Sequence, residues 1–282
     1  MTKNSKNILH INLTQQDYQL KTYNDLNPFI GGVGLSLKLF LDNKEKNPVI
    51  FSCGPLSGIF PFASKICVLY KDKNSNLNEA YGGGSFAAKL RILGIDAIII
   101  YGKLKNSNFI SVEQNKVDFI CLKDKDKIAQ FGIAGRKSTL YFGRRVGIDK
   151  YFSFGGADFN IINLTALTIS GEGEIVIPNQ KEYWEVYTKI LEKKYNLSVQ
   201  YSSCPSCFGC PAGCEFSKEG EERKIATLPK CLVSCQFAEE IYKDISLVFS
   251  CLTVLGYKYN HEDLENISDL VGGLRKELSE SI

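Results

Sequence analysis

The sequence predicts an α+β fold, with a sheet-rich N-terminal domain at residues 1–178 and a smaller, mostly helical portion at residues 179–282. Up to Pro178, short apolar and β-branched runs alternate with glycine turns, which is typical of strands. After Pro178, apolar residues recur at helical spacing instead. A chain of 282 residues is long enough for one large domain or two ordinary ones.

The N-terminal domain is expected to contain much antiparallel sheet and two helices that follow glycine-rich loops. One helix should begin near Gly34, and the other should begin near Phe86 and end at Gly94. The predicted strands are residues 8–13, 49–52, 65–70, 96–102, 109–112, 119–122 and 166–170.

Three helices are expected in the second portion, each from a stripe of apolar residues. The stripe of the first helix is Trp184, Tyr187 and Leu191. The second helix should end at Gly256, and its stripe is Phe237, Ile241, Ile245, Val248 and Leu255. Asn260 can cap the third helix, whose stripe is Leu264, Ile267, Val271, Leu274 and Leu278.

Charge and hydropathy exclude several classes of function. The net charge is +3, from 34 basic and 31 acidic residues, so no electrostatic argument favours nucleic acid or an anionic membrane as a partner. The N-terminus, MTKNSKNILHINL, lacks the apolar core and cleavage site of a signal peptide. No apolar run approaches the roughly 20 residues that span a bilayer. We therefore expect a cytoplasmic protein.

Residues 204–214, CPSCFGCPAGC, hold four of the ten cysteines. Disulfides are disfavoured in a reducing cytosol, so such a cluster indicates metal binding or catalysis. The spacing C-x2-C-x2-C-x3-C matches the bacterial ferredoxin run and favours a [4Fe-4S] cluster. The predicted ligands are Cys204, Cys207, Cys210 and Cys214. Zinc binding and thiols without a metal remain alternatives.

The other cysteines and the two histidines bear on which residue is the fourth ligand and on whether the metal is zinc. In ferredoxins the fourth cysteine of the run usually binds a second cluster, so the fourth ligand is open. Cys204 is the first choice, ahead of Cys231, Cys235 and Cys251. Zinc would favour two separated CxxC knuckles or histidine ligands, but His10 and His261 are both far from the run in sequence. The remaining cysteines, Cys53, Cys67 and Cys121, are expected to be buried small hydrophobic residues.

The glycine loops are ambiguous without further information. GGVG and GGG each precede a predicted helix, where backbone N–H groups could bind phosphate. Tight turns with close packing explain the same glycines equally well.

Five segments occur in a fixed order: FIGGVGLSLKLF, FSCGPLSG, GGGSFAAKLRILGIDAIIIYGK, NLTALTISGEGEIVIPN and CFGCPAGC. Together they resemble the tungsten-dependent aldehyde:ferredoxin oxidoreductase family. The resemblance implies an N-terminal domain that supports a tungsten or molybdenum bis-pterin, oxidation of aldehydes to acids, and a [4Fe-4S] cluster that passes electrons to ferredoxin. It also implies that Cys207, Cys210 and Cys214 are three cluster ligands.

The resemblance extends to the pterin site, but with changes. Gly83 and Gly84 match a glycine loop near the pterin, and Lys65 stands where the family has an arginine. Positions at which the family's pterin-binding motifs have arginine, asparagine and an acid are Val33, Tyr81 and Lys258 here. Family members are also much longer. The expected protein is therefore a truncated, divergent member that keeps the iron–sulfur centre without a working tungstopterin site.

The sequence leaves three functions open. The first is an electron-transfer or accessory iron–sulfur protein. The second is an oxidoreductase that acts on aldehyde or oxo groups with ferredoxin or another redox protein as acceptor, completed by another subunit or a homodimer. The third is a zinc-stabilised or metal-free structural protein.

Overall fold

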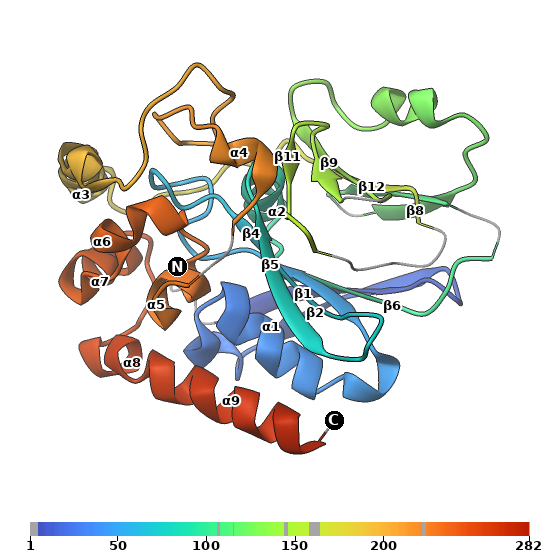
Figure 1. Ribbon diagram of the computed structural model, residues 1–282, viewed down its shortest axis with the longest axis horizontal. Coiled ribbons are helices and arrows are strands. Elements are labelled where there is room, and N and C mark those ends of the chain that lie inside the picture. Colours follow the sequence, from blue (N-terminus) through green and yellow to red (C-terminus); the bar gives the residue numbers. More distant parts are fainter. Residues whose placement is uncertain are drawn as a thin grey trace.

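A computed structural model describes residues 5–105, 108–114, 116–143, 146–157, 164–221 and 224–281. Within these ranges the strands form two sheets of six (Figure 1). The first sheet has the order β2-β1-β6-β3-β4-β5, and only its β1–β6 pair is parallel. Its strands are β1 (Lys6–Asn12), β2 (Asp17–Tyr23), β3 (Val49–Ser52), β4 (Ile66–Lys71), β5 (Leu77–Gly82) and β6 (Ala97–Tyr101).

The second sheet has the order β11-β10-β9-β12-β7-β8, and only its β7–β12 pair is parallel. Its strands are β7 (Phe109–Glu113), β8 (Lys116–Ile120), β9 (Lys137–Tyr141), β10 (Gly147–Ile148), β11 (Phe152–Ser153) and β12 (Ala166–Ser170). Asn163, the first residue of the segment NLTALTISGEGEIVIPN, lies outside the described residues.

The central strands of the first sheet are buried on both faces because their apolar residues belong to two hydrophobic clusters. In β3, Ile50 belongs to the cluster shared with the C-terminal helices, and Phe51 belongs to the cluster shared with the second sheet. In β4, Cys67 and Val68 divide between the clusters in the same way. Successive side chains of a strand point to opposite faces, so near-continuous apolar runs are what such a sheet requires.

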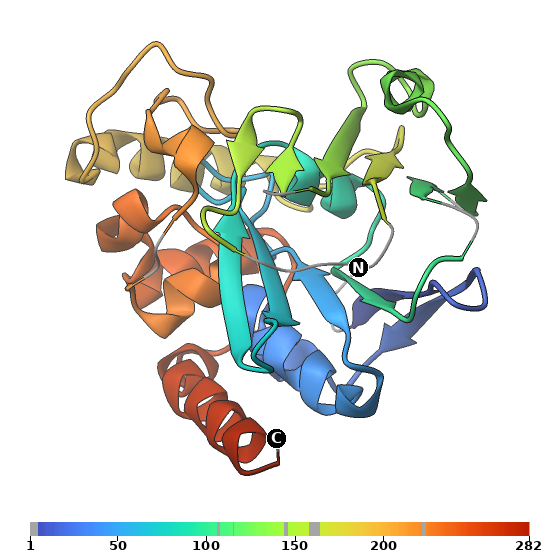
Figure 2. The same ribbon diagram turned by 45° about the vertical axis from the view of Figure 1, so that its right-hand side comes forward.

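Helices pack on one face of the first sheet (Figure 2). The other face shares a hydrophobic cluster with the second sheet and the helix that begins at Phe86. The α-helices are α1 (Gly32–Leu41), α2 (Phe86–Ile92), α3 (Gln180–Glu192), α4 (Phe216–Glu219), α5 (Thr227–Leu232), α6 (Glu239–Tyr242), α7 (Ile245–Val254), α8 (His261–Glu265) and α9 (Ile267–Ser281). The 3-10 helices are η1 (Asn27–Phe29), η2 (Lys44–Lys46), η3 (Lys125–Gln130), η4 (Lys193–Asn196) and η5 (Gln236–Ala238).

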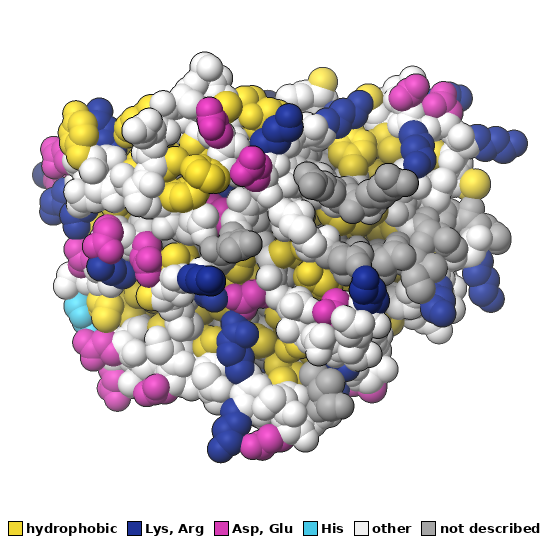
Figure 3. All heavy atoms as spheres, in the orientation of Figure 1, with side chains coloured by type: hydrophobic (Ala, Val, Ile, Leu, Met, Phe, Trp, Pro, Cys, Tyr) yellow, Lys and Arg dark blue, Asp and Glu magenta, His cyan; other side chains and the backbone are white. Residues whose placement is uncertain are grey.

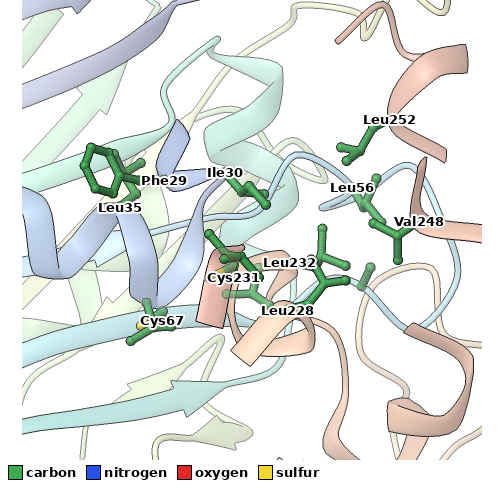
Figure 4. Packing of buried hydrophobic residues seen from close by; sticks show 14 of the residues in the cluster. Phe29, Ile30, Leu35, Leu56, Cys67, Leu228, Cys231, Leu232, Val248 and Leu252 are labelled. Atoms are coloured by element: carbon green, nitrogen blue, oxygen red, sulfur yellow. The ribbon is translucent and has the colours of Figure 1, made fainter. Parts of the chain in front are cut away.

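The C-terminal helices share one core with the first sheet. α1 packs against α5, α9, β3 and β4. Figure 4 shows Leu228, Cys231 and Leu232 of α5 close to Ile30 in this core. Because this cluster includes residues from both portions of the chain, the helical portion is packed on the sheet domain. The boundary near residue 178 stays a prediction.

The predicted fold class is confirmed, with two sheets followed by helices after residue 180. Two details of the predicted helices are wrong. α3 buries Tyr183, Val186 and Ile190, and Trp184 is 59% exposed, because the Tyr183 hydroxyl turns inward and donates to the Ile59 carbonyl at 2.8 Å.

The second predicted helix is divided into η5, α6 and α7. The division occurs where the Asp244 side chain caps α7 by accepting from the Leu247 N–H. The third stripe lies on α8 and α9, and Asn260 forms a capping box with Asp263 as expected for an N-cap.

Among the described helices, none is long and apolar enough to cross a membrane.

A test of the core concerns Gly54, where β3 leads into the loop beneath α5. A Cβ at this position would overlap the Leu232 carbonyl and lie 2.9 Å from Val233. We expect Gly54→Ala to lower the free energy of unfolding by at least about 1–3 kcal/mol, as overpacking does. Gly272→Ala is the matched control, because it meets open space on α9 and should be neutral or stabilising by up to about 1 kcal/mol. Urea unfolding measures both, and equal effects would contradict the packing described.

Candidate metal and cofactor site

The Cys loop, residues 204–214, runs between α3 and α4 (Figure 1). Its ends are joined where the Ser202 N–H donates to the Gly213 carbonyl at 2.6 Å. The Cys210 N–H donates to the Cys207 carbonyl at 3.0 Å, which closes a tight turn. Gly213 is required because a Cβ there would lie 2.5 Å from the Ser202 carbonyl and would overlap that of Cys204.

The loop is docked on the glycine segment that follows β5. The Phe208 N–H donates to the Gly84 carbonyl at 3.1 Å, and the Ser64 hydroxyl donates to the Phe208 carbonyl. A Cβ at Gly83 would lie 2.5 Å from Cys207 Sγ and 3.4 Å from Lys65 Nζ. The fold therefore brings a predicted cluster ligand, Cys207, against two residues predicted to contact a pterin.

Lys65 forms a buried ion pair that sequence reasoning missed. Its Nζ lies 2.6 Å from Glu221 Oε1, and the two side chains are 5% and 0% exposed. Glu221 Oε2 accepts from the Gln236 N–H at 3.3 Å, and Glu221 pairs with Tyr81 of β5 in an isolated antiparallel bridge. The cation is thereby held between the sheet, the Cys loop and the carboxylate of Glu221, which the start of η5 fixes.

Burial and charge act in opposite directions on Lys65. Desolvation by itself lowers the pKa of its ammonium group, but the negative charges available at Cys207, Glu221 and Cys235 outweigh it and raise the pKa. Lys65 is therefore a permanent positive charge beside the Cys loop.

The thiols of the loop show the reverse pattern. Desolvation is the main reason that the pKa of Cys210 is raised to about 11 and that the pKa of Cys214 is also raised. The neighbouring Cys207 acts in the same direction on both pKa values, and Lys65 acts in the opposite direction. Cys210 and Cys214 thus lie in an environment in which forming thiolates requires added positive charge. All ten cysteines lie within the described ranges, and none forms a disulfide.

Cys204 has its own set of neighbours. Its N–H donates to the Ser202 hydroxyl at 3.1 Å, and its thiol interacts with the Tyr151 hydroxyl. The same hydroxyl also interacts electrostatically with Cys214. Among the described residues, no group of three or more His, Cys, Asp or Glu side chains converges on one point that could hold a single metal ion. A [4Fe-4S] cluster is bound differently, since its four thiolates bind four irons.

The other cysteines divide clearly. Cys235 is partly buried close to Glu221, Lys65 and Cys207, and desolvation raises its pKa well above the ordinary value. Cys231 and Cys251 lie in the hydrophobic core (Figure 4 shows Cys231). Cys53 and Cys67 are buried as expected, whereas Cys121 is exposed, because it follows β8, the edge strand of the second sheet.

Side chains of this chain occupy the surroundings of the predicted pterin residues. A Cβ at Gly84 would lie 2.9 Å from both Ile148 and Phe152, and Gly84 needs its positive φ of 87° to make the turn. With Cys207 against Gly83 and Glu221 on Lys65, the arrangement does not fit a bis-pterin beside these three residues. Of the substituted positions, Val33 and Tyr81 are buried and Lys258 is exposed.

Asp149 is a second residue that sequence reasoning missed. Its carboxylate accepts from the Ser85 hydroxyl at 2.8 Å and from the Thr139 N–H at 2.9 Å. It thus ties the glycine segment to β9 of the second sheet. Asp149 has a φ of 53°, a left-handed conformation that aspartate tolerates better than most residues. No sequence motif marks a single aspartate that links two distant segments.

Comparison with known proteins finds similarity to tungsten-containing aldehyde ferredoxin oxidoreductases. Residues 8–134 match the family model for the aldehyde ferredoxin oxidoreductase N-terminal domain. This match covers the N-terminal part of the chain, and low-identity relatives support a relationship to the same family.

Two relatives are tungsten-containing aldehyde ferredoxin oxidoreductases. The protein from Pyrococcus furiosus is 24% identical over 177 residues, which are 58% of this chain and 28% of the relative. The protein from Pyrococcus abyssi is 25% identical over 220 residues, which are 66% of this chain and 36% of the relative. The matched region thus spans about a third of the curated relatives.

The fold is also similar to a solved structure described as the active site complex BamBC of benzoyl coenzyme A reductase in complex with 1,5-dienoyl-CoA. The TM-score is 0.62 at 14% identity, and the match covers 91% of this chain and 53% of the other. At this identity the similarity concerns the fold alone.

The buried ion pair can be tested by removing one or both charges. We expect Glu221→Ala to lower the free energy of unfolding by about 3–5 kcal/mol, because it leaves the Lys65 ammonium buried without its carboxylate. The double variant Lys65→Met/Glu221→Leu should recover most of that loss, since an apolar pair of similar volume needs no solvation. Urea unfolding of both variants is the measurement. A double variant as unstable as Glu221→Ala would contradict the account.

Proposed function

We propose that this protein is an iron–sulfur member of the aldehyde ferredoxin oxidoreductase family with an electron-transfer or accessory role. In this proposal the Cys loop binds a [4Fe-4S] cluster. The neighbouring residues Lys65, Gly83 and Gly84, here called the platform, do not support a functional tungstopterin. The observation that carries the proposal is the position of Cys207 beside Gly83 and the buried cation Lys65, whose charge also acts on Cys210 and Cys214, with all three cysteines free of disulfides.

The donor set suits such a cluster. Thiolates are the ligands of iron–sulfur clusters. Because the pKa values of Cys210 and Cys214 are raised, these thiols keep their protons without a metal, and binding of cationic iron would displace the protons. Lys65 adds positive charge on the buried side, where water cannot screen it. A bound cluster would accept and donate single electrons. The chain's own residues would hold it, exclude solvent from one side and offset its charge.

The position of the Cys loop also supports exchange of electrons with a partner. Large apolar side chains near the loop are exposed to solvent, namely Tyr201 at 49%, Phe208 at 40% and Phe216 at 44%. In Figure 3, hydrophobic side chains appear on this face among interspersed acidic and basic ones. We propose ferredoxin, another redox protein, a second copy or a complementing subunit as the partner here.

Aldehyde oxidation is the second candidate function. Its support is the family itself, whose relatives are tungsten-containing aldehyde ferredoxin oxidoreductases. Metal analysis separates the alternatives: tungsten or molybdenum with a pterin favours aldehyde oxidation, iron with sulfide alone favours electron transfer, and stoichiometric zinc favours a structural role. Turnover of an aldehyde with a viologen acceptor would show the second function directly.

The first test of the cluster is its composition. We expect anaerobically purified protein to contain iron and acid-labile sulfide and to be brown. Cys207→Ala should lose most of both, because Cys207 is a predicted ligand docked beside Lys65. Cys121→Ala is the matched control, since Cys121 is exposed on the second sheet and should leave iron unchanged. Equal iron and sulfide in both variants, or zinc without sulfide in the wild type, would overturn the proposal.

A second test concerns the fourth ligand. Cys204 is the proposed fourth thiolate, and Cys235 is the reserve, because it is partly buried near Cys207 and Lys65. We expect Cys204→Ala to lower the iron content and alter the spectrum of the reduced protein, whereas Cys235→Ala leaves both unchanged. The reverse result would assign Cys235. If both variants keep full iron and an unchanged spectrum, one iron lacks a cysteine ligand from these two positions.

A further inference from the structure

In the platform formed by Lys65, Gly83 and Gly84, the lysine is already paired with a carboxylate of this chain, that of Glu221. Glu221 Oε1 lies 2.6 Å from Lys65 Nζ, and both side chains are almost completely buried. A cation at such a position is what would attract the phosphate of a bound cofactor. Here the chain itself supplies the anion.

The carboxylate is fixed rather than free to swing away. Its other oxygen accepts from the Gln236 N–H, and its backbone pairs with Tyr81 of β5. Gly220, immediately before it, has a φ of 87° and packs so closely on Gly155 that any side chain would clash. The segment that presents Glu221 is therefore held at both its backbone and its side chain.

The remaining sides of the platform are also closed. Cys207 Sγ lies against Gly83, and Ile148 and Phe152 lie against Gly84. An incoming anion would have to separate a desolvated ion pair as well as displace packed side chains. Leaving either charge buried without its partner is strongly unfavourable, so the pair resists exchange.

We propose that the Glu221 carboxylate takes the place of an external anion on Lys65 and thereby prevents a phosphate-bearing cofactor from binding to this platform. The inference rests on the proposed function in one respect, that these residues are a pterin platform that no longer works. It does not depend on whether the Cys loop binds a cluster.

The test measures binding of inorganic pyrophosphate to the full chain by isothermal titration calorimetry. Glu221→Ala should bind pyrophosphate at least about tenfold more tightly than the wild type, because it exposes Lys65 to an external anion. Glu221→Gln, which keeps the shape of the side chain, should show the same direction and serves if Glu221→Ala does not fold. Glu219→Ala, which removes a neighbouring exposed carboxylate, should bind as the wild type does.

The double variant Lys65→Met/Glu221→Leu shows whether Lys65 is responsible. It should lose the gain, since it removes the cation together with the carboxylate. Wild-type binding as tight as that of Glu221→Ala and Glu221→Gln would overturn the inference, and so would an equal gain in the double variant. Iron content, measured on the same preparations, reports on the cluster separately. If the protein holds no iron but its Glu221 variants bind pyrophosphate more tightly, the proposed function is wrong and this inference is supported.

Discussion

The buried ion pair between Lys65 and Glu221 is the interaction on which the arrangement of the site depends. It joins the start of β4 to a segment that follows the Cys loop by only a few residues. A buried charge is tolerated only when it is paired, so each residue fixes the position of the other. Because Cys207 packs beside the same lysine, the pair also determines the charge that the loop thiols experience.

The sheets provide the rigid support that such a pair requires. The central strands of the first sheet are buried on both faces and divide their side chains between two clusters. The glycine segment after β5 is held from the far side by Asp149, which reaches it from the second sheet. The Cys loop itself has little secondary structure, and its shape comes from tight turns and from docking on this support.

Hydrophobic periodicity predicted the fold class and most of the buried elements. The strand of residues 49–52 and the helix ended by Gly94 were clear because apolar runs and glycine stops coincide there. β2 escaped prediction because it is an edge strand with a mostly exposed, polar sequence. The division between α6 and α7 was missed because an N-cap, Asp244, interrupts a stripe that looks continuous.

The site was predictable only in part. The cysteine spacing indicated the loop, and family resemblance brought Lys65, Gly83 and Gly84 to attention. Glu221 lies in a charged run, EGEER, that looks like solvated surface, and only the tertiary fold brings it to Lys65. The same holds for Asp149. Pairing between distant charged residues leaves no periodic signal in a single sequence.

The central claim, that the Cys loop holds an iron–sulfur cluster, is tested most directly by electron paramagnetic resonance of the anaerobically reconstituted, dithionite-reduced protein. The account predicts the low-temperature signal of a one-electron-reduced [4Fe-4S] cluster, present in the wild type and in Cys121→Ala. A protein that is fully folded but shows no such signal, and that holds zinc or no metal in its place, would contradict it.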